Sequence, residues 1–173
     1  SLSGTPLKAA DPISLPPIGI TMGCPVGIGP EVILKYFLGN PVATAAFVVI
    51  GDPGVLRRAA DAIGVTADIV AWQPGDTVVA GAINVVAVGH LDVSDLRWGH
   101  PDAATGRAMA GYIEEAVRLI AEGRVAGMVT CPITKTALRL AGYSYPGHTE
   151  ILAELTGTAD FAMMMAADDL KVV

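Results

Sequence analysis

The sequence predicts an α/β protein with a largely parallel sheet and helices on both of its faces. Short apolar runs without charge alternate along the chain with longer segments in which apolar residues recur at three- and four-residue spacing. This alternation is typical of parallel strands joined by crossover helices. The composition also suits buried elements, because 52% of the 173 residues are hydrophobic and only 16% are charged.

In chain order, the strand patterns are short and the helix patterns are longer. Pro132 ends the fourth strand because it has no N–H to donate, and Gly142 ends a short helix. Strands are expected at residues 18–22, 46–50, 83–88 and 127–130, with later ones at 161–166 and 170–173. Helices are expected at residues 30–38, 54–63, 105–122 and 137–140, and another begins at 148–149.

The clearest helix pattern is at residues 105–122. Its apolar stripe includes Met109, Tyr112, Ile113 and Ala116, and charged residues occupy the opposite face. A stripe of this kind indicates a helix that covers a sheet, so we interpret it as core and not as a cofactor-binding motif.

The chain is expected to contain three parts: a loose leader at residues 1–17, part of a first α/β domain at 18–140, and the start of a second domain at 141–173. The leader contains Pro12, Pro16 and Pro17 and little periodic structure. The apolar pattern at 170–173 is followed by no turn or cap. The chain is therefore expected to be incomplete.

Charge and composition exclude several classes of partner. The net charge of −6 argues against a nucleic-acid surface, which needs clustered Lys and Arg. No apolar run reaches the roughly 18 residues needed to cross a bilayer. Cys24 and Cys131 form neither a CxxC pair nor a zinc-binding spacing with histidine. A reduced, cytoplasmic setting is expected, with no nucleic-acid or membrane partner.

The residues after the fourth strand are the first candidate site. Thr134, Lys135 and Thr136 place two hydroxyls and an ammonium group at the carboxyl end of that strand, where open α/β sheets bind their ligands. His148 and Thr149 follow a Pro-Gly turn at the start of the next helix. A helix N-terminus beside an imidazole and a hydroxyl can bind an anion.

An ordinary structural role explains the same residues. Thr149 could cap the helix, Lys135 could be a solvated loop lysine, and His148 could hydrogen-bond to the backbone of its turn. Chemistry alone favours this alternative, because caps are common and one contributes only ~1 kcal/mol.

A glycine-rich loop is the second candidate. Gly23, Gly27 and Gly29 follow the first strand, and Pro30 opens the next helix. The spacing matches neither a Walker A loop nor the GxGxxG fingerprint. A ligand loop and a tight strand-to-helix turn therefore remain equal alternatives.

The remaining histidines give weaker signals. His100 lies between Gly99 and Pro101 near the start of the long helix, where a loop or capping role is expected. His90 has no partner at metal-ligand spacing.

Three motifs carry a resemblance to a known family. They are Ile20–Glu31 (ITMGCPVGIGPE), the stretch from Gly99-His100 to Tyr112-Ile113, and Thr130–Glu150, with TCPITKTAL and PGHTE at its two ends. In order and spacing they resemble the 4-hydroxythreonine-4-phosphate dehydrogenase family, over about the N-terminal half of a family chain. That family usually has Met-Gly-Asp-Pro where this chain has Cys24, so the resemblance carries over no role for the aspartate.

The resemblance implies a fold like that of isocitrate and isopropylmalate dehydrogenases, with two α/β domains, a cleft between them and a homodimer. It implies oxidation of 4-phosphohydroxy-L-threonine by NAD or NADP, followed by decarboxylation, in the synthesis of pyridoxal phosphate. A divalent metal (Zn, Mg, Mn or Co) would act as a Lewis acid. His148 and Thr149 would bind the phosphorylated substrate.

The metal-binding histidines and most cofactor contacts of that family fall beyond Val173. No metal ligand, catalytic residue or cofactor contact is therefore assigned within this chain, which alone is expected to be inactive. Two alternatives stay open. One is a dehydrogenase of a related acid such as erythronate or threonate phosphate; the other is a non-catalytic α/β binding module, if the native chain ends here.

Overall fold

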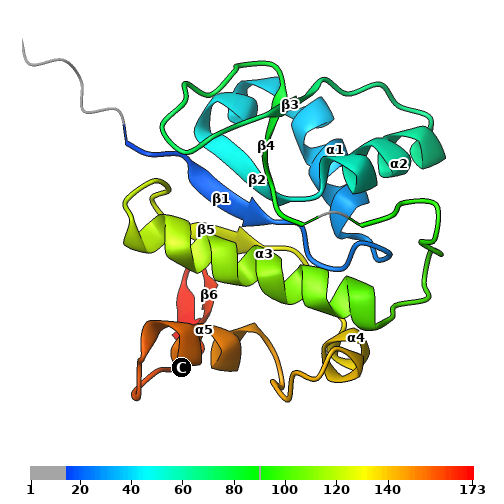
Figure 1. Ribbon diagram of the computed structural model, residues 1–173. Helices are drawn as coiled ribbons and strands as arrows, with labels where there is room; N and C mark the ends of the chain where they lie inside the picture. The colour runs from blue at the N-terminus through cyan, green and yellow to red at the C-terminus, as the bar shows by residue number, and fades with distance from the viewer. Residues whose placement is uncertain (1–14, 90) are drawn as a thin grey trace, which may run out of the picture.

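The structure is a computed structural model that describes residues 15–89 and 91–173. Of the predicted leader, only residues 15–17 fall within this part, and His90 lies outside it. The main sheet has five parallel strands in the order β3-β4-β2-β1-β5 (Figure 1). The strands are β1 (Ile18–Thr21), β2 (Phe47–Gly51), β3 (Ile69–Ala71), β4 (Ile83–Ala87) and β5 (Met128–Thr130).

Within the described residues, five α-helices and one 3₁₀-helix accompany the strands. They are α1 (Gly29–Gly39), η1 (Pro41–Ala46), α2 (Pro53–Ile63), α3 (Ala103–Ala121), α4 (Lys135–Leu140) and α5 (His148–Thr156). The predicted helices and the first four predicted strands are confirmed, with boundaries within two residues. The prediction missed β3 and η1, because a three-residue strand and a 3₁₀-helix are too short to show a period.

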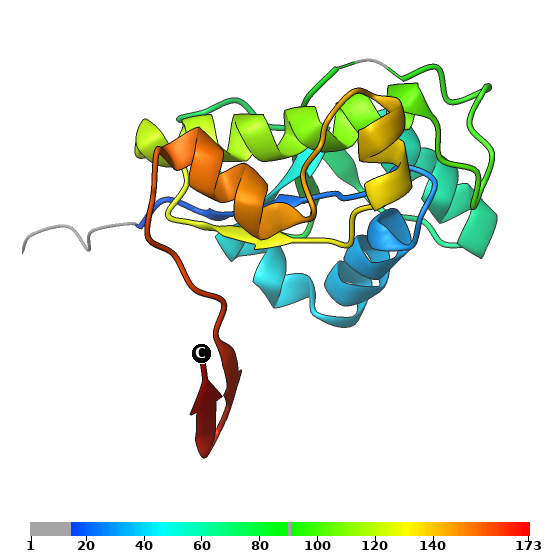
Figure 2. The same cartoon turned by 90° about the horizontal axis from the view of Figure 1, so that it is seen from below.

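The direction of the crossovers decides which face each helix covers. The connections from β1 to β2 and from β2 to β3 run the same way across the sheet, whereas α3 carries the chain back from β4 past β2 and β1 to β5. Right-handed crossovers therefore place α1 and α2 on one face and α3 on the other. Figure 2 shows α3, α4 and α5 together on one side of the sheet and α1 on the opposite side, so the predicted two-sided cover is confirmed.

The core lies where α3 crosses the sheet. Val48, Val49 and Ile50 of β2 have no exposed surface, and Met109 and Tyr112 of α3 are likewise fully buried. Burying an aliphatic side chain of this kind stabilises the fold by about 1.5–3 kcal/mol. The predicted apolar stripe of α3 is therefore core, as expected.

Two aspartates fix the starts of the helices that flank this core. The Asp52 carboxylate accepts hydrogen bonds from the N–H groups of Gly54 (2.7 Å) and Leu91 (3.1 Å), so it caps α2 and ties down the loop after β4. Asp102 and Thr105 form a capping box at the start of α3. The cap of α3 is thus Asp102; His100 lies in the preceding loop and does not cap the helix.

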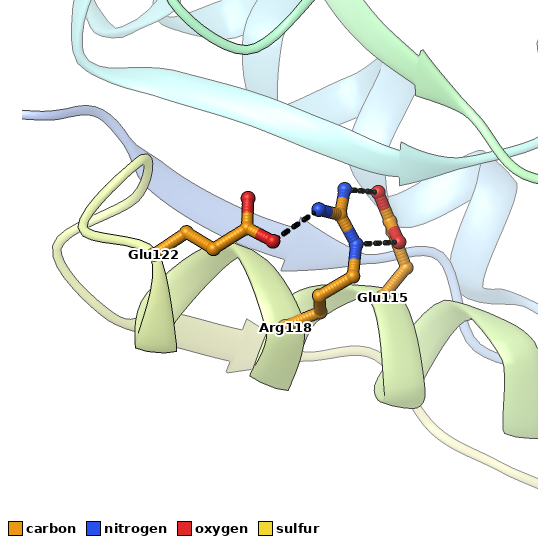
Figure 3. Close-up of polar contacts among 3 residues, drawn as sticks. All are labelled: Glu115, Arg118 and Glu122. Atoms are coloured by element: carbon orange, nitrogen blue, oxygen red, sulfur yellow. Dashed lines mark hydrogen bonds and ion pairs between the residues drawn. The ribbon is translucent and has the colours of Figure 1, made fainter.

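The outer face of α3 carries a solvent-facing ion-pair cluster. Arg118 donates two hydrogen bonds to Glu115, at 2.8 and 2.6 Å, and one to Glu122 at 2.6 Å (Figure 3). These carboxylates raise the pKa of Arg118. Exposed pairs at this spacing support the helix only weakly.

The two C-terminal strands do not extend the parallel sheet. β6 (Met165–Ala167) and β7 (Leu170–Val172) pair with each other in antiparallel fashion, and every residue of both is exposed. Only Asp168 and Asp169 separate them. A two-residue link permits a hairpin, but a parallel pair needs a crossover connection of a dozen or more residues. Strands are present where predicted, although residues 161–164 lie outside them.

The predicted domain boundary near residue 140 and the resemblance to isocitrate dehydrogenase remain predictions. α5 packs against α3, and its Ile151 belongs to the same buried cluster as the sheet.

Candidate functional site

The strand order reverses between β1 and β5, and open α/β sheets bind ligands at the carboxyl edge beside such a point. In this structure, the backbone of the loops after β1 and β5 occupies that edge of the sheet. The Cys24 N–H donates to the Pro132 carbonyl at 3.0 Å, so the loops after β1 and β5 touch. Gly23 has a φ of 72°, and a Cβ there would overlap that same carbonyl.

The other glycines of this loop are also required by close packing. A Cβ at Gly29 would overlap the Met22 carbonyl, and one at Gly27 would lie 3.1 Å from Cys24 Cβ. Residues 23–26 are buried, Gly27 is partly buried and only Ile28 of this stretch is exposed. These contacts favour the tight strand-to-helix turn over a loop that closes on a ligand.

The two cysteines are buried free thiols on either side of this junction, and the Cys131 thiol donates a weak hydrogen bond to the Gly29 carbonyl at 4.0 Å. Burial raises the pKa of Cys131 to about 11, so its thiol is protonated at neutral pH. A protonated buried thiol is a poor nucleophile and a poor metal ligand.

The polar residues after β5 do not all lie in a loop. Lys135 and Thr136 form the first turn of α4, and only Thr134 precedes the helix. α4 docks closely on α3, since a Cβ at Gly106 would overlap the Ala137 carbonyl. Ala137 and Leu138 face this contact and are fully buried, so Lys135 is left on the exposed side.

The chain leaves α4 through a Schellman motif. The N–H of Tyr143 donates to Leu138 O at 2.9 Å, and the N–H of Gly142 donates to Arg139 O at 3.0 Å. Gly142 has a φ of 92°, which a residue with a side chain would adopt only under strain. The turn after α4 is therefore fixed by its own backbone hydrogen bonds.

This turn forms one wall of a hollow of about 640 Å³. The hollow is lined by Lys135, Arg139, Gly142, Tyr143, Ser144, Tyr145 and Pro146. It brings Lys135 together with Ser144 and the two tyrosines. His148 and Thr149 are not among its lining residues, although they follow Pro146 closely in the chain.

His148 and Thr149 begin α5, as predicted. Gly147 is the N-cap residue, and no side chain caps the helix, so Thr149 is not the cap that the structural alternative required. His148 is half-buried as a residue; its Nε2 is fully buried and has no hydrogen-bond partner among the residues that the structure describes. Burial lowers the pKa of His148, which favours the neutral imidazole near pH 7. A neutral ring with a free nitrogen can hydrogen-bond to a substrate hydroxyl or carboxylate.

Groups of opposite charge lie at the start of α5. The N–H groups of the first turn of α5 favour an anion. Glu150 is also in that turn, and its carboxylate lies close to Gly147. An anionic group bound here would have to displace or bridge this carboxylate.

A divalent metal does not fit the part of the chain that the structure describes. Within residues 15–89 and 91–173, no group of three His, Cys, Asp or Glu side chains could hold an ion. Across the same residues, no helix is long and apolar enough to cross a membrane.

Sequence reasoning missed the roles of three residues in the fold. Gly106 permits the docking of α4, and Asp52 joins two loops. Tyr112, expected only as a member of the core stripe, has a buried hydroxyl for which the described residues provide no hydrogen-bond partner. Only Asp52 carried a local signal, since Asp-Pro-Gly before an apolar helix pattern is typical of an N-cap followed by Pro at N1. The other two depend on contacts between distant segments.

The fold and the candidate site define a parallel α/β protein whose conspicuous polar groups gather after β5, at the start of α4 and α5. The family described as "Pyridoxal phosphate biosynthetic protein PdxA" matches residues 43–173, and the chain belongs to this family. Two of the three motifs fall within that match. The third, Ile20–Glu31, falls within alignments to curated relatives that cover 91% of the chain.

Individual relatives agree with this assignment. The chain is 44% identical to a 4-hydroxythreonine-4-phosphate dehydrogenase of Desulforapulum autotrophicum, over 91% of this chain and 47% of the relative. It is 38% identical to a D-threonate 4-phosphate dehydrogenase of Pectobacterium atrosepticum, over 90% of this chain and 49% of the relative. The chain therefore spans about half the length of the curated relatives it matches.

A solved structure shows the same fold. The crystal structure of 4-hydroxythreonine-4-phosphate dehydrogenase from Klebsiella pneumoniae superposes with a TM-score of 0.84 at 36% identity, covering 93% of this chain and 50% of that chain.

Proposed function

We propose that a protein of the relatives' length carrying this chain is an oxidoreductase that dehydrogenates a phosphorylated hydroxy acid. Membership of the family and the names of the relatives support this class of reaction. The preferred substrate is 4-phosphohydroxy-L-threonine, whose secondary alcohol would be oxidised by NAD or NADP before decarboxylation. The product would serve the synthesis of pyridoxal phosphate.

The observation that carries the proposal is the unpartnered nitrogen of His148 at the start of α5. A buried polar atom without a hydrogen bond costs free energy, so a site that keeps one commonly reserves it for a ligand. Thr149 adds a hydroxyl next to it. We propose that these two side chains contact the substrate, with the neutral His148 ring orienting one of its oxygens.

The cofactor and the metal would be held mainly by other residues of the longer protein. The glycine-rich loop packs against Pro132 and Met22, so we assign it no phosphate contact. The part of the chain that the structure describes contains no suitable ligand group for a divalent ion, and no step is assigned to one. A cytoplasmic homodimer remains part of the proposal.

A second substrate is D-threonate 4-phosphate, because relatives with 37–40% identity carry that name. The two substrates share the phosphate and the secondary alcohol and differ at C2, where threonate has a hydroxyl in place of the amino group. Parallel assays with both compounds separate them.

The test is His148→Ala in a protein of the relatives' length. We expect kcat/KM for the preferred substrate to fall at least about tenfold, equivalent to ~1.4 kcal/mol of lost transition-state stabilisation. Lys35→Ala, which changes an exposed residue on α1, is the control and should leave kcat/KM unchanged. Unchanged kinetics in the His148 variant would remove this residue from the substrate site.

A further inference from the structure

The hollow between α4 and the turn at residues 142–146 contains two cations that pair with no carboxylate in the described part of the chain. Lys135 and Arg139 lie one helical turn apart on the exposed side of α4, and both line the hollow. Among the described residues, neither forms an ion pair or a side-chain hydrogen bond. No Asp or Glu within residues 15–89 and 91–173 lines the hollow. In a chain whose net charge is −6, two neighbouring cations without a carboxylate are a local exception.

The walls of the hollow are fixed in position. The Schellman motif holds Gly142 and Tyr143 against the end of α4, and the rings of Tyr143 and Tyr145 stack with centroids 6.1 Å apart. The buried residues Ala137 and Leu138 anchor α4 itself. The two cations therefore project from a helix that is packed in place and face a turn that is closed by hydrogen bonds.

Hydroxyl groups complete the lining. The pKa of Tyr143 is raised, first by burial, and that of Tyr145 is raised, first by its hydrogen bond to Glu154, so both phenols are neutral at pH 7. Tyr143 and Ser144 can donate hydrogen bonds to an anion. Glu114 and Glu154 act on the tyrosine pair but do not line the hollow.

We propose that this hollow binds a phosphate group, with Lys135 and Arg139 as its two cationic contacts. Arg pairs with phosphate oxygens through two parallel N–H groups and Lys supplies a point charge, a combination suited to a phosphate monoester. The volume of about 640 Å³ leaves room for the organic part of a small ligand. The site does not include His148 and does not require the dehydrogenase activity.

Two sources of phosphate fit this chemistry: a phosphorylated hydroxy acid and the phosphate of a nucleotide. Competition distinguishes them. If 4-phosphoerythronate displaces inorganic phosphate at lower concentration than adenosine 2′,5′-bisphosphate does, the site recognises the acid. The reverse order assigns it to a nucleotide.

The experiment titrates inorganic phosphate into the 173-residue chain and follows the backbone amide resonances of Gly142 and Ser144, with chloride at matched ionic strength as the reference. We expect saturable shifts at these amides. Lys135→Ala and Arg139→Ala should each weaken binding several-fold, and the double variant at least tenfold. Raising the salt concentration should also weaken it, because exposed charges are screened.

Two controls separate this site from general charge effects and from the proposed substrate site. Arg57→Ala removes an exposed cation from α2 and should leave the phosphate affinity within twofold. His148→Ala should do the same, so the inference can fail or hold independently of the role of His148. Shifts that are absent at matched ionic strength, or equal in the double variant and the parent, would overturn the proposal.

Discussion

The parallel sheet and the C-terminal hairpin are both apolar, yet only the sheet is buried. Four of the five residues of β2 are buried, whereas Met165 of β6 is 69% exposed and Leu170 of β7 is 64% exposed. In Figure 2 the hairpin projects away from the body of the molecule. The difference shows that apolar composition alone does not place a strand in a core. Helices cover both faces of the sheet, and nothing among the described residues covers the hairpin.

Between the buried sheet and the exposed hairpin, the number of buried residues in each element falls along the chain after β5. α4 contributes two buried residues, α5 contributes one, and the hairpin contributes none. The candidate ligand groups, Lys135, Arg139 and His148, all lie on the two intermediate helices. Their positions therefore depend on how firmly those helices are joined to the body.

The largest expected effect comes from the joint between α3 and α4. Gly106→Ala should destabilise the protein by about 2–4 kcal/mol, because the new Cβ would overlap the Ala137 carbonyl, and this exceeds the ~1 kcal/mol gained in helix propensity. Urea unfolding measures the change. Gly111→Ala is the matched control on the same helix; its Cβ would meet only Val88 Cγ1, at 3.7 Å, so it should be neutral or stabilising. Equal effects at both positions would contradict the close α3–α4 contact.

A smaller effect of opposite sign is expected inside the body. The hydroxyl of Tyr112 is buried and has no hydrogen-bond partner among the described residues, and its pKa is raised, chiefly by burial. Tyr112→Phe should therefore stabilise the fold by about 1 kcal/mol, since it removes a polar group that lost its water contacts on folding. A Tyr36→Phe variant, which alters an exposed residue of α1, should change nothing. A clear loss of stability on Tyr112→Phe would mean that the hydroxyl has a partner.

The smallest effect concerns the hairpin. Removing residues 159–173 should change the free energy of unfolding by less than about 0.5 kcal/mol, because a two-stranded hairpin without a packed face contributes little. Ile151→Ala is the contrasting change: Ile151 is only 2% exposed, and the substitution should cost about 2–4 kcal/mol. A loss above 1 kcal/mol on truncation would show that the hairpin packs on the body in solution.

The local sequence pattern was sufficient to predict most of the helices and strands. The apolar stripe of α3, the break at Pro132 and the end of α4 at Gly142 depend on residues within one or two turns of each other, so the sequence revealed them. The start of α5 at His148 was predicted from the Pro-Gly turn for the same reason. β3 was missed because three residues do not establish a period. The cap of α3 is Asp102, whereas the pattern placed the start of the helix at Thr105.

By itself, the sequence determined the α/β class, the family motifs, and the approximate bounds of the helices and of the first four predicted strands. Each of these depends on residues that are neighbours along the chain. Tertiary structure alone decided which glycines are needed for close approach, which cations lack a counter-ion and which buried polar atoms lack a partner. These properties depend on distances between segments far apart in sequence, such as Gly106 with Ala137 and Gly23 with Pro132. The direction of the chain across the sheet sets those distances, because right-handed crossovers fix the face that each helix covers.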